Sequence, residues 1–183
     1  IFVSDMFSDE YGGGAELTTE AFFKTSPYKT FKLKSEELDE TKISQGVQKT
    51  WVFFNFRSMN HNLIPAMIQN LYFFIVEYDY KFCKYRSLDL HLREEGEECG
   101  CHNDQIGKFI STFYAGAQHM FLMSHAQKNI ITDRFPFLEE NTSVLSSAFD
   151  VKTLEQIDKL HNERLKNGNN GKHAVVDGNS WIK

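Results

Sequence analysis

The amino-acid sequence predicts an α/β fold in which a mostly parallel sheet lies between helices on both faces. Short apolar runs typical of buried strands alternate along the chain with longer amphipathic segments typical of helices. Parallel strands need crossover connections, and right-handed helical crossovers cover the sheet. The chain has 183 residues, is 41% hydrophobic and contains 17 Phe, so we expect one compact core, over residues 1–165.

Six short apolar runs predict the strands. They cover residues 1–7, 28–35, 51–56, 71–80, 118–124 and 142–149. Amphipathic or polar segments predict helices at residues 15–25, 35–49, 60–70, 106–117, 125–135 and 150–172. Pro27 ends the first helix, and Ser35 is the expected N-cap of the second. This alternation is typical of a three-layer, Rossmann-like domain.

Residues 166–183 depart from the alternation. The segment "NGNNG" has the composition of a linker, and "HAVVDGNSWIK" then begins a new apolar run. The new run is either a final strand of the same sheet or the first strand of a second domain that is truncated here.

Gly12, Gly13 and Gly14 stand between the first strand and the first helix. Consecutive glycines are costly in backbone entropy, so they indicate a positive φ or the close approach of another group. The loop is either a tight structural turn or a ligand cradle, in which backbone N–H groups at the start of the helix face an anion. It matches neither GxGxxG nor GxxxxGK[ST], so it has no dinucleotide or P-loop motif. Asp5, near the end of the first strand, either binds the same ligand or caps the turn.

Composition limits the partners. The net charge is -5 and the pI about 5.8, which gives no basic footprint for nucleic acid. The apolar runs are far shorter than a transmembrane segment, and the N-terminus lacks the pattern of a signal peptide. Three Cys is an odd count, which favours a reducing compartment or a metal over a disulfide framework. We therefore expect a cytoplasmic protein.

The order of the segments resembles the amino-terminal, Rossmann-like domain of GT-B glycosyltransferases of the family 4-like group. "YGGGAELTTEAF" is similar to the Gly-Gly-Ala-Glu loop that opens the first helix of that domain. "HMFLMSHAQKNIITDRFP" is similar to a strand that ends in Ser before a helix, and "TSVLSSAFD" to a strand with an Asn-Gly turn. "HAVVDGNSWIK" resembles the first strand of the donor-nucleotide domain. The resemblance covers most of the chain, in order.

The resemblance implies the acceptor-side half of a hexosyltransferase-type enzyme, which transfers a sugar from a nucleotide-sugar donor to a carbohydrate acceptor. It implies that residues 166–183 are the linker and first strand of a donor domain whose remainder is missing. It also implies that the glycine loop binds the substrate or its diphosphate. The residues concerned are Gly12, Gly13, Gly14 and Glu16, with Asp5 beside them. The donor-binding groups of the family belong to the second domain, so we expect no turnover by this chain alone.

Glu77 and Asp79 end the fourth strand, where the family often has a His-containing acceptor segment. The resemblance makes both carboxylates candidates for contacts with acceptor hydroxyls, although the His is absent from "VEYDY". The basic cluster that follows, formed by Lys81, Lys84 and Arg86, either faces an anionic ligand or is simply solvated.

A second group of residues points to a metal. Its members are Cys83, His91, Cys99, Cys101 and His102. Tetrahedral zinc takes four N or S ligands, which three Cys and one His can provide, so Cys83, His91, Cys99 and Cys101 are candidate ligands of a structural zinc. The alternatives are three unrelated thiols near a charged surface loop, or a redox or disulfide pair. A sugar- or phosphate-binding module without a catalytic partner and a zinc-stabilised interaction domain are the other function classes left open.

Overall fold

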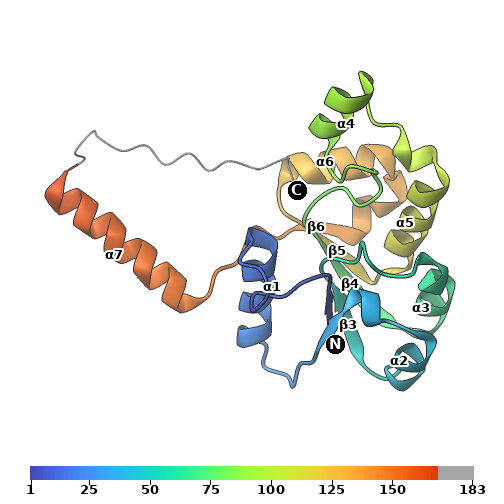
Figure 1. Cartoon of the computed structure of the whole chain (residues 1–183), viewed down its shortest axis with the longest axis horizontal. Coiled ribbons are helices and arrows are strands. Elements are labelled where there is room, and N and C mark those ends of the chain that lie inside the picture. Colours follow the sequence, from blue (N-terminus) through green and yellow to red (C-terminus); the bar gives the residue numbers. More distant parts are fainter. Residues whose placement is uncertain (169–183) are drawn as a thin grey trace. The chain divides into compact units, whose positions relative to one another are not determined.

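The computed structural model describes residues 1–168 and divides into two compact units, of which the first, residues 1–148, holds a single sheet (Figure 1). The six strands have the order β2-β1-β3-β4-β5-β6, and every neighbouring pair is parallel. The strands are β1 (Phe2–Ser4), β2 (Lys32–Lys34), β3 (Thr50–Phe53), β4 (Tyr72–Glu77), β5 (His119–Leu122) and β6 (Thr142–Val144). The predicted α/β class is confirmed.

Helices connect successive strands of this unit. They are α1 (Gly14–Thr25), α2 (Glu40–Gln45), α3 (Ile64–Asn70), α4 (Leu88–Glu95), α5 (Gln105–Gly116) and α6 (His125–Arg134). Four short 3₁₀ helices accompany them: η1 (Ser35–Glu37), η2 (His61–Leu63), η3 (Cys101–Asn103) and η4 (Pro136–Asn141). Because parallel strands cannot be joined by tight turns, each connection carries such a helical crossover.

Aromatic side chains fill both faces of the sheet. On one face, the ring centroid of Phe54 lies 5.8 Å from that of Phe22 on α1. On the other face, the ring of Phe113 on α5 lies 5.0 Å from Phe53 and 4.8 Å from Phe73. Neighbouring residues of an extended chain point in opposite directions, so Phe53 and Phe54 anchor the two covering layers. The predicted three-layer arrangement is therefore present.

One helix was not predicted, and one expected cap was wrong. Helix α4 lies in a charged, Cys-containing segment whose apolar pattern is too weak to predict a helix. Ser35 is not the N-cap of the second helix, because α2 begins after Asp39, whose side chain accepts the N–H of Lys42. The Ser35 hydroxyl instead donates to Asp5.

The strand order defines where a ligand is expected. From β1 the chain passes through α1 to β2 on one side, whereas from β3 it passes through α3 to β4 on the other side. The loops after β1 and β3 therefore diverge at the carboxyl ends of these strands. In open α/β sheets, ligands bind at such a switch point.

The second unit begins at Phe149, and its described part is helix α7 (Val151–Asn167). The boundary expected at residue 165 falls inside this helix. The strand expected within residues 173–183 lies outside the described residues, so the proposed second domain stays a prediction. None of the helices in residues 1–168 has both the length and the apolar character needed to cross a membrane.

Candidate functional site at the carboxyl edge of the sheet

Asp5, directly after β1, joins the loops that follow the first three strands. Its Oδ1 accepts the N–H of Ser58 at 3.0 Å, and its Oδ2 accepts the N–H of Arg57 at 3.1 Å. The hydroxyl of Ser35, directly after β2, also donates to Oδ1. These donors belong to the chain itself, so Asp5 fixes the shape of the carboxyl edge, and its contact with a ligand stays a prediction.

Glu77, the last residue of β4, is fully buried. Its Oε1 accepts a hydrogen bond from Nζ of Lys81 at 2.6 Å, and its Oε2 accepts one from the hydroxyl of Tyr114 at 2.5 Å. Burial raises the pKa of Glu77 to about 7, although the Lys81 charge opposes the rise. The carboxylate is closed off from solvent, so the geometry favours a role in holding Lys81; the predicted hydroxyl contact is untested.

Asp79 and Arg86 hold the far end of the loop that leaves β4. Asp79 Oδ2 accepts Nε–H of Arg86 at 2.6 Å, and Arg86 Nη2 donates to Asn55 Oδ1 at 3.0 Å. Burial alone would raise the pKa of Asp79, but the charges of Lys81 and Arg86 outweigh burial and lower it. Arg86 has a φ of 57°, a left-handed conformation that costs a non-glycine residue about 1 kcal/mol. The hydrogen bonds of its guanidinium offset that cost.

The three glycines after β1 have different surroundings. A Cβ added at Gly13 would lie 2.3 Å from Oε2 of Glu16 and 2.7 Å from the ring of Tyr11. A Cβ at Gly12 or Gly14 would meet nothing within 4 Å, and neither residue has a positive φ. A side chain at Gly13 would therefore displace Glu16 and Tyr11, whereas open space lies beside Gly12 and Gly14, at the start of α1.

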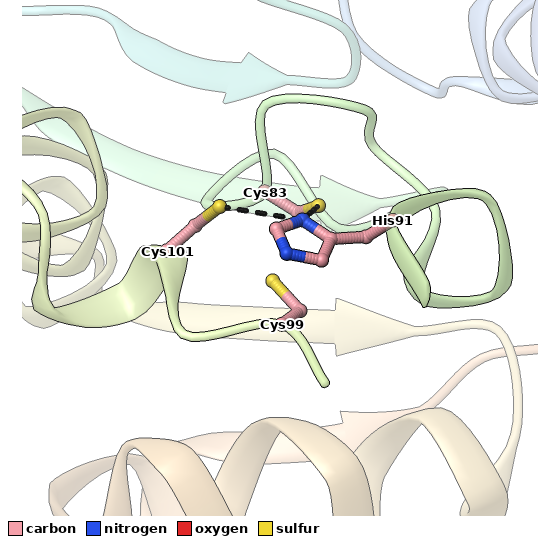
Figure 2. A group of neighbouring side chains, drawn as sticks. All are labelled: Cys83, His91, Cys99 and Cys101. Carbon is pink, nitrogen blue, oxygen red and sulfur yellow. Dashed lines mark hydrogen bonds between the residues drawn. The ribbon is translucent and has the colours of Figure 1, made fainter. Parts of the chain in front are cut away.

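Four side chains from the connection between β4 and β5 converge on one point, as Figure 2 shows. They are Cys83 from the loop after β4, His91 from α4, and Cys99 and Cys101 from the segment that leads into η3. Their ligand atoms lie within 4.8 Å of one another, and all four residues are buried. The structure thus brings together four residues predicted from the sequence, in a cluster that can hold a metal ion.

The interior of this metal cluster is compact. Nδ1 of His91 lies 3.6 Å from Sγ of Cys83 and 3.6 Å from Sγ of Cys101. Burial raises the pKa of the Cys99 thiol to about 12, so the thiol stays protonated unless a cation binds.

His102 lies outside the cluster, where its Nε2 is 3.1 Å from Nδ2 of Asn103. All three cysteines are free thiols, so the disulfide alternative is not realised in this structure.

Contacts that the sequence did not reveal support the metal cluster. The loop next to Cys83 is tied to α4, because Lys84 Nζ lies 2.7 Å and the Tyr85 hydroxyl 2.5 Å from Oε1 of Glu95. On the other side, the backbone around Cys101 packs directly on α5. A Cβ added at Gly107 would lie 1.9 Å from the Cys101 carbonyl oxygen. Gly107 follows a polar segment, and nothing in the sequence around it indicates this contact.

A cavity of about 320 Å³ opens at the same edge of the sheet. The loop after β3, the loop after β4 and helix α5 line it. It includes all three members of the predicted basic cluster, together with Arg57 and His61, which sequence reasoning missed. In the sequence, Arg57 and His61 stand out only as members of a polar segment that follows a buried strand.

Comparisons with known proteins identify no relative. No family model, curated protein or solved structure matches the chain.

We predict that Gly107→Ala destabilises the protein by about 1–3 kcal/mol, because the added methyl group meets backbone that cannot rotate away. Alanine stabilises a helix by about 1 kcal/mol relative to glycine, so a loss of stability shows that the clash outweighs the gain in helix propensity. Gly100→Ala is the matched control, since a Cβ there meets nothing within 4 Å. Urea unfolding measures both variants. Equal stabilities would contradict the close contact between Cys101 and α5.

We also predict that Glu77→Gln alters the pH dependence of stability. The pKa of Glu77 is raised by folding, so its stabilising contribution is complete below the unfolded pKa of about 4.5 and is lost as pH rises through about 7. The wild-type advantage over the variant should therefore shrink between pH 5 and pH 8. All other ionisable groups are the same in both proteins, so the difference in unfolding free energy isolates Glu77. An advantage that grows with pH would show that the ion pair with Lys81 prevails over burial.

Proposed function

We propose that this chain is the acceptor-side half of a GT-B, family 4-like glycosyltransferase, which transfers a sugar from a nucleotide-sugar donor to a carbohydrate acceptor. The ordered motifs support this proposal, and the six-stranded parallel sheet is the fold that they require. In this proposal, the donor nucleotide binds a second Rossmann-like domain that is joined through residues 166–183.

The observation that carries the proposal is the open space beside Gly12 and Gly14. These residues have ordinary backbone angles and no neighbour that would exclude a side chain, so the fold does not require glycine at either position. A ligand that approaches the backbone at the start of α1 would require it. The loop also follows β1, at the switch point of the sheet, where ligands of this fold class bind.

The side chain of Glu16 limits what the loop can bind. It is buried in the first turn of α1, with its carboxylate beside Gly13. A carboxylate there competes with a diphosphate for the positive end of the helix and accepts hydrogen bonds from hydroxyls. We therefore assign the loop to sugar hydroxyls of the substrate rather than to the diphosphate.

The metal cluster is proposed to hold a structural zinc ion. Tetrahedral zinc, with Zn–S of about 2.3 Å and Zn–N of about 2.0–2.1 Å, separates S and N ligands by about 3.5–3.6 Å. The two S···N distances from His91 are both 3.6 Å. Three Cys and one His leave no position open for substrate, which is typical of structural sites. Buried reduced thiols and a metal are also consistent with the expected cytoplasmic location.

The glycine loop provides the test of the sugar-binding assignment. We predict that Gly12→Ala/Gly14→Ala weakens binding of nucleotide sugars or oligosaccharides at least about fivefold, because the new methyl groups occupy the ligand's space. The melting temperature should stay unchanged or rise slightly, since the fold accommodates both methyl groups. Gly100→Ala is the control, because it makes the same chemical change away from the loop. Ligand-observed NMR with a panel of nucleotide sugars and saccharides measures the affinities.

Wild-type affinity in the double variant would contradict the assignment.

A radiolabelled transfer assay with the same panel tests the division between two domains. We expect no transfer by the 183-residue chain. Transfer would place the donor site within these residues and overturn the proposed half-enzyme.

For the metal cluster we predict about one zinc ion per purified chain, measured by elemental analysis. Cys99→Ser and His91→Asn should lose the metal and lower the melting temperature by more than about 10 °C, because metal binding contributes directly to folding. His102→Asn is the matched control, since this neighbouring histidine lies outside the cluster. It should keep the metal. Metal-free wild-type protein with an unchanged melting temperature would leave only a cluster of buried thiols.

A further inference from the structure

The cavity at the carboxyl edge has a lining whose charged side chains are all positive. They are Arg57 from the loop after β3 and Lys81, Lys84 and Arg86 from the loop after β4. Among the described residues, no carboxylate lines the cavity. The volume of about 320 Å³ lies at the lower end of the range for small-molecule sites, about 300–1,000 Å³.

Three of the four cations already have carboxylate partners outside the lining. Lys81 is paired with Glu77 and Asp79, Arg86 with Asp79, and Lys84 with Glu95. These pairs fix the positions of the cations.

Arg57 is different. Within residues 1–168, its guanidinium forms no ion pair or hydrogen bond, and its backbone N–H is held by Asp5. A guanidinium offers five N–H donors in a planar fork that matches a carboxylate or a phosphate. The cavity thus combines one cation that is free to bind with others whose positions are set.

The remaining walls suit a small organic molecule. The exposed side chain of Ile106 supplies apolar surface, and Phe56 and Ile110 are buried behind the wall. His61 is half-buried, and its imidazole makes no hydrogen bond within the described residues. Burial lowers the pKa of His61, so the neutral ring offers one donor and one acceptor, as hydroxyl groups require.

We propose that this cavity binds a small organic anion of about monosaccharide size, whose carboxylate or phosphate oxygens are bound by Arg57 and Lys84. Its hydroxyls contact His61 and its apolar face lies on Ile106. The proposal does not rest on sugar transfer, because it follows from the charge and the shape of the cavity alone.

NMR titrations of the ¹⁵N-labelled protein test the proposed anion binding. The protein is used as purified, without chelators, and at low ionic strength. The probes are glucuronate, glucose 6-phosphate and glucose, which share a pyranose ring and differ in charge. We expect at least one anionic probe to shift the amide resonances of residues 56–61 and 81–86 in a saturable way, whereas glucose does not. The probe that binds identifies the anionic group as a carboxylate or a phosphate.

Arg57→Gln should weaken that binding at least about tenfold, because it removes charge-assisted hydrogen bonds. Arg93→Gln is the matched control. It removes the same charge from an exposed residue of α4 that does not line the cavity, and it should change the affinity less than about twofold. Lys84→Gln gives a second test on a residue whose side chain is half exposed.

Three results would overturn the proposal. The first is a Kd above about 10 mM for both anions. The second is binding of glucose as tightly as the anions. The third is equal weakening by Arg57→Gln and Arg93→Gln, which would show that the anion responds only to the overall charge of the protein. Because Arg57 is exposed and its side chain has no partner within the described residues, a loss of binding in its variant does not arise from unfolding.

Discussion

The carboxyl edge of the sheet depends on one carboxylate, Glu77, which has no access to solvent. A buried carboxyl group is tolerated only when its oxygens have hydrogen-bond partners inside the protein. Lys81 supplies one from the loop after β4, and Tyr114 supplies another from α5. Glu77 therefore determines how the loop leaves the sheet and where α5 lies against it.

Asp79 and Arg86 secure the rest of that loop. The N–H of Arg86 donates to the Cys83 carbonyl oxygen at 2.9 Å, and the left-handed backbone of Arg86 turns the chain toward α4. Cys83 lies between Lys81 and Arg86, so one short segment supplies a residue to the metal cluster and four to the cavity. The ion pairs, the cluster and the cavity are neighbours because they share this segment.

The sequence was sufficient for the sheet and for the metal cluster. Buried parallel strands are almost continuous apolar runs, so the strands were recognisable, although all six are shorter than the runs that predicted them. Cys83, His91, Cys99 and Cys101 were recognisable because few residue types bind metals through sulfur or imidazole. Arg57 and His61 are ordinary polar residues whose importance arises only where three separate segments meet. The pairing of Glu77 with Tyr114 depends in the same way on the tertiary packing of α5 on the sheet.

The metal cluster also has a consequence for the order in which the chain is assembled. Its four ligands lie between residues 83 and 101, on the single connection from β4 to β5. The sheet, in contrast, pairs segments as distant as Phe2 and Val52. Short loops close at a lower entropic cost, and synthesis proceeds from the amino terminus. All four cluster residues therefore leave the ribosome before Tyr114, β5 and β6, so the cluster is complete in a nascent chain whose sheet is still incomplete.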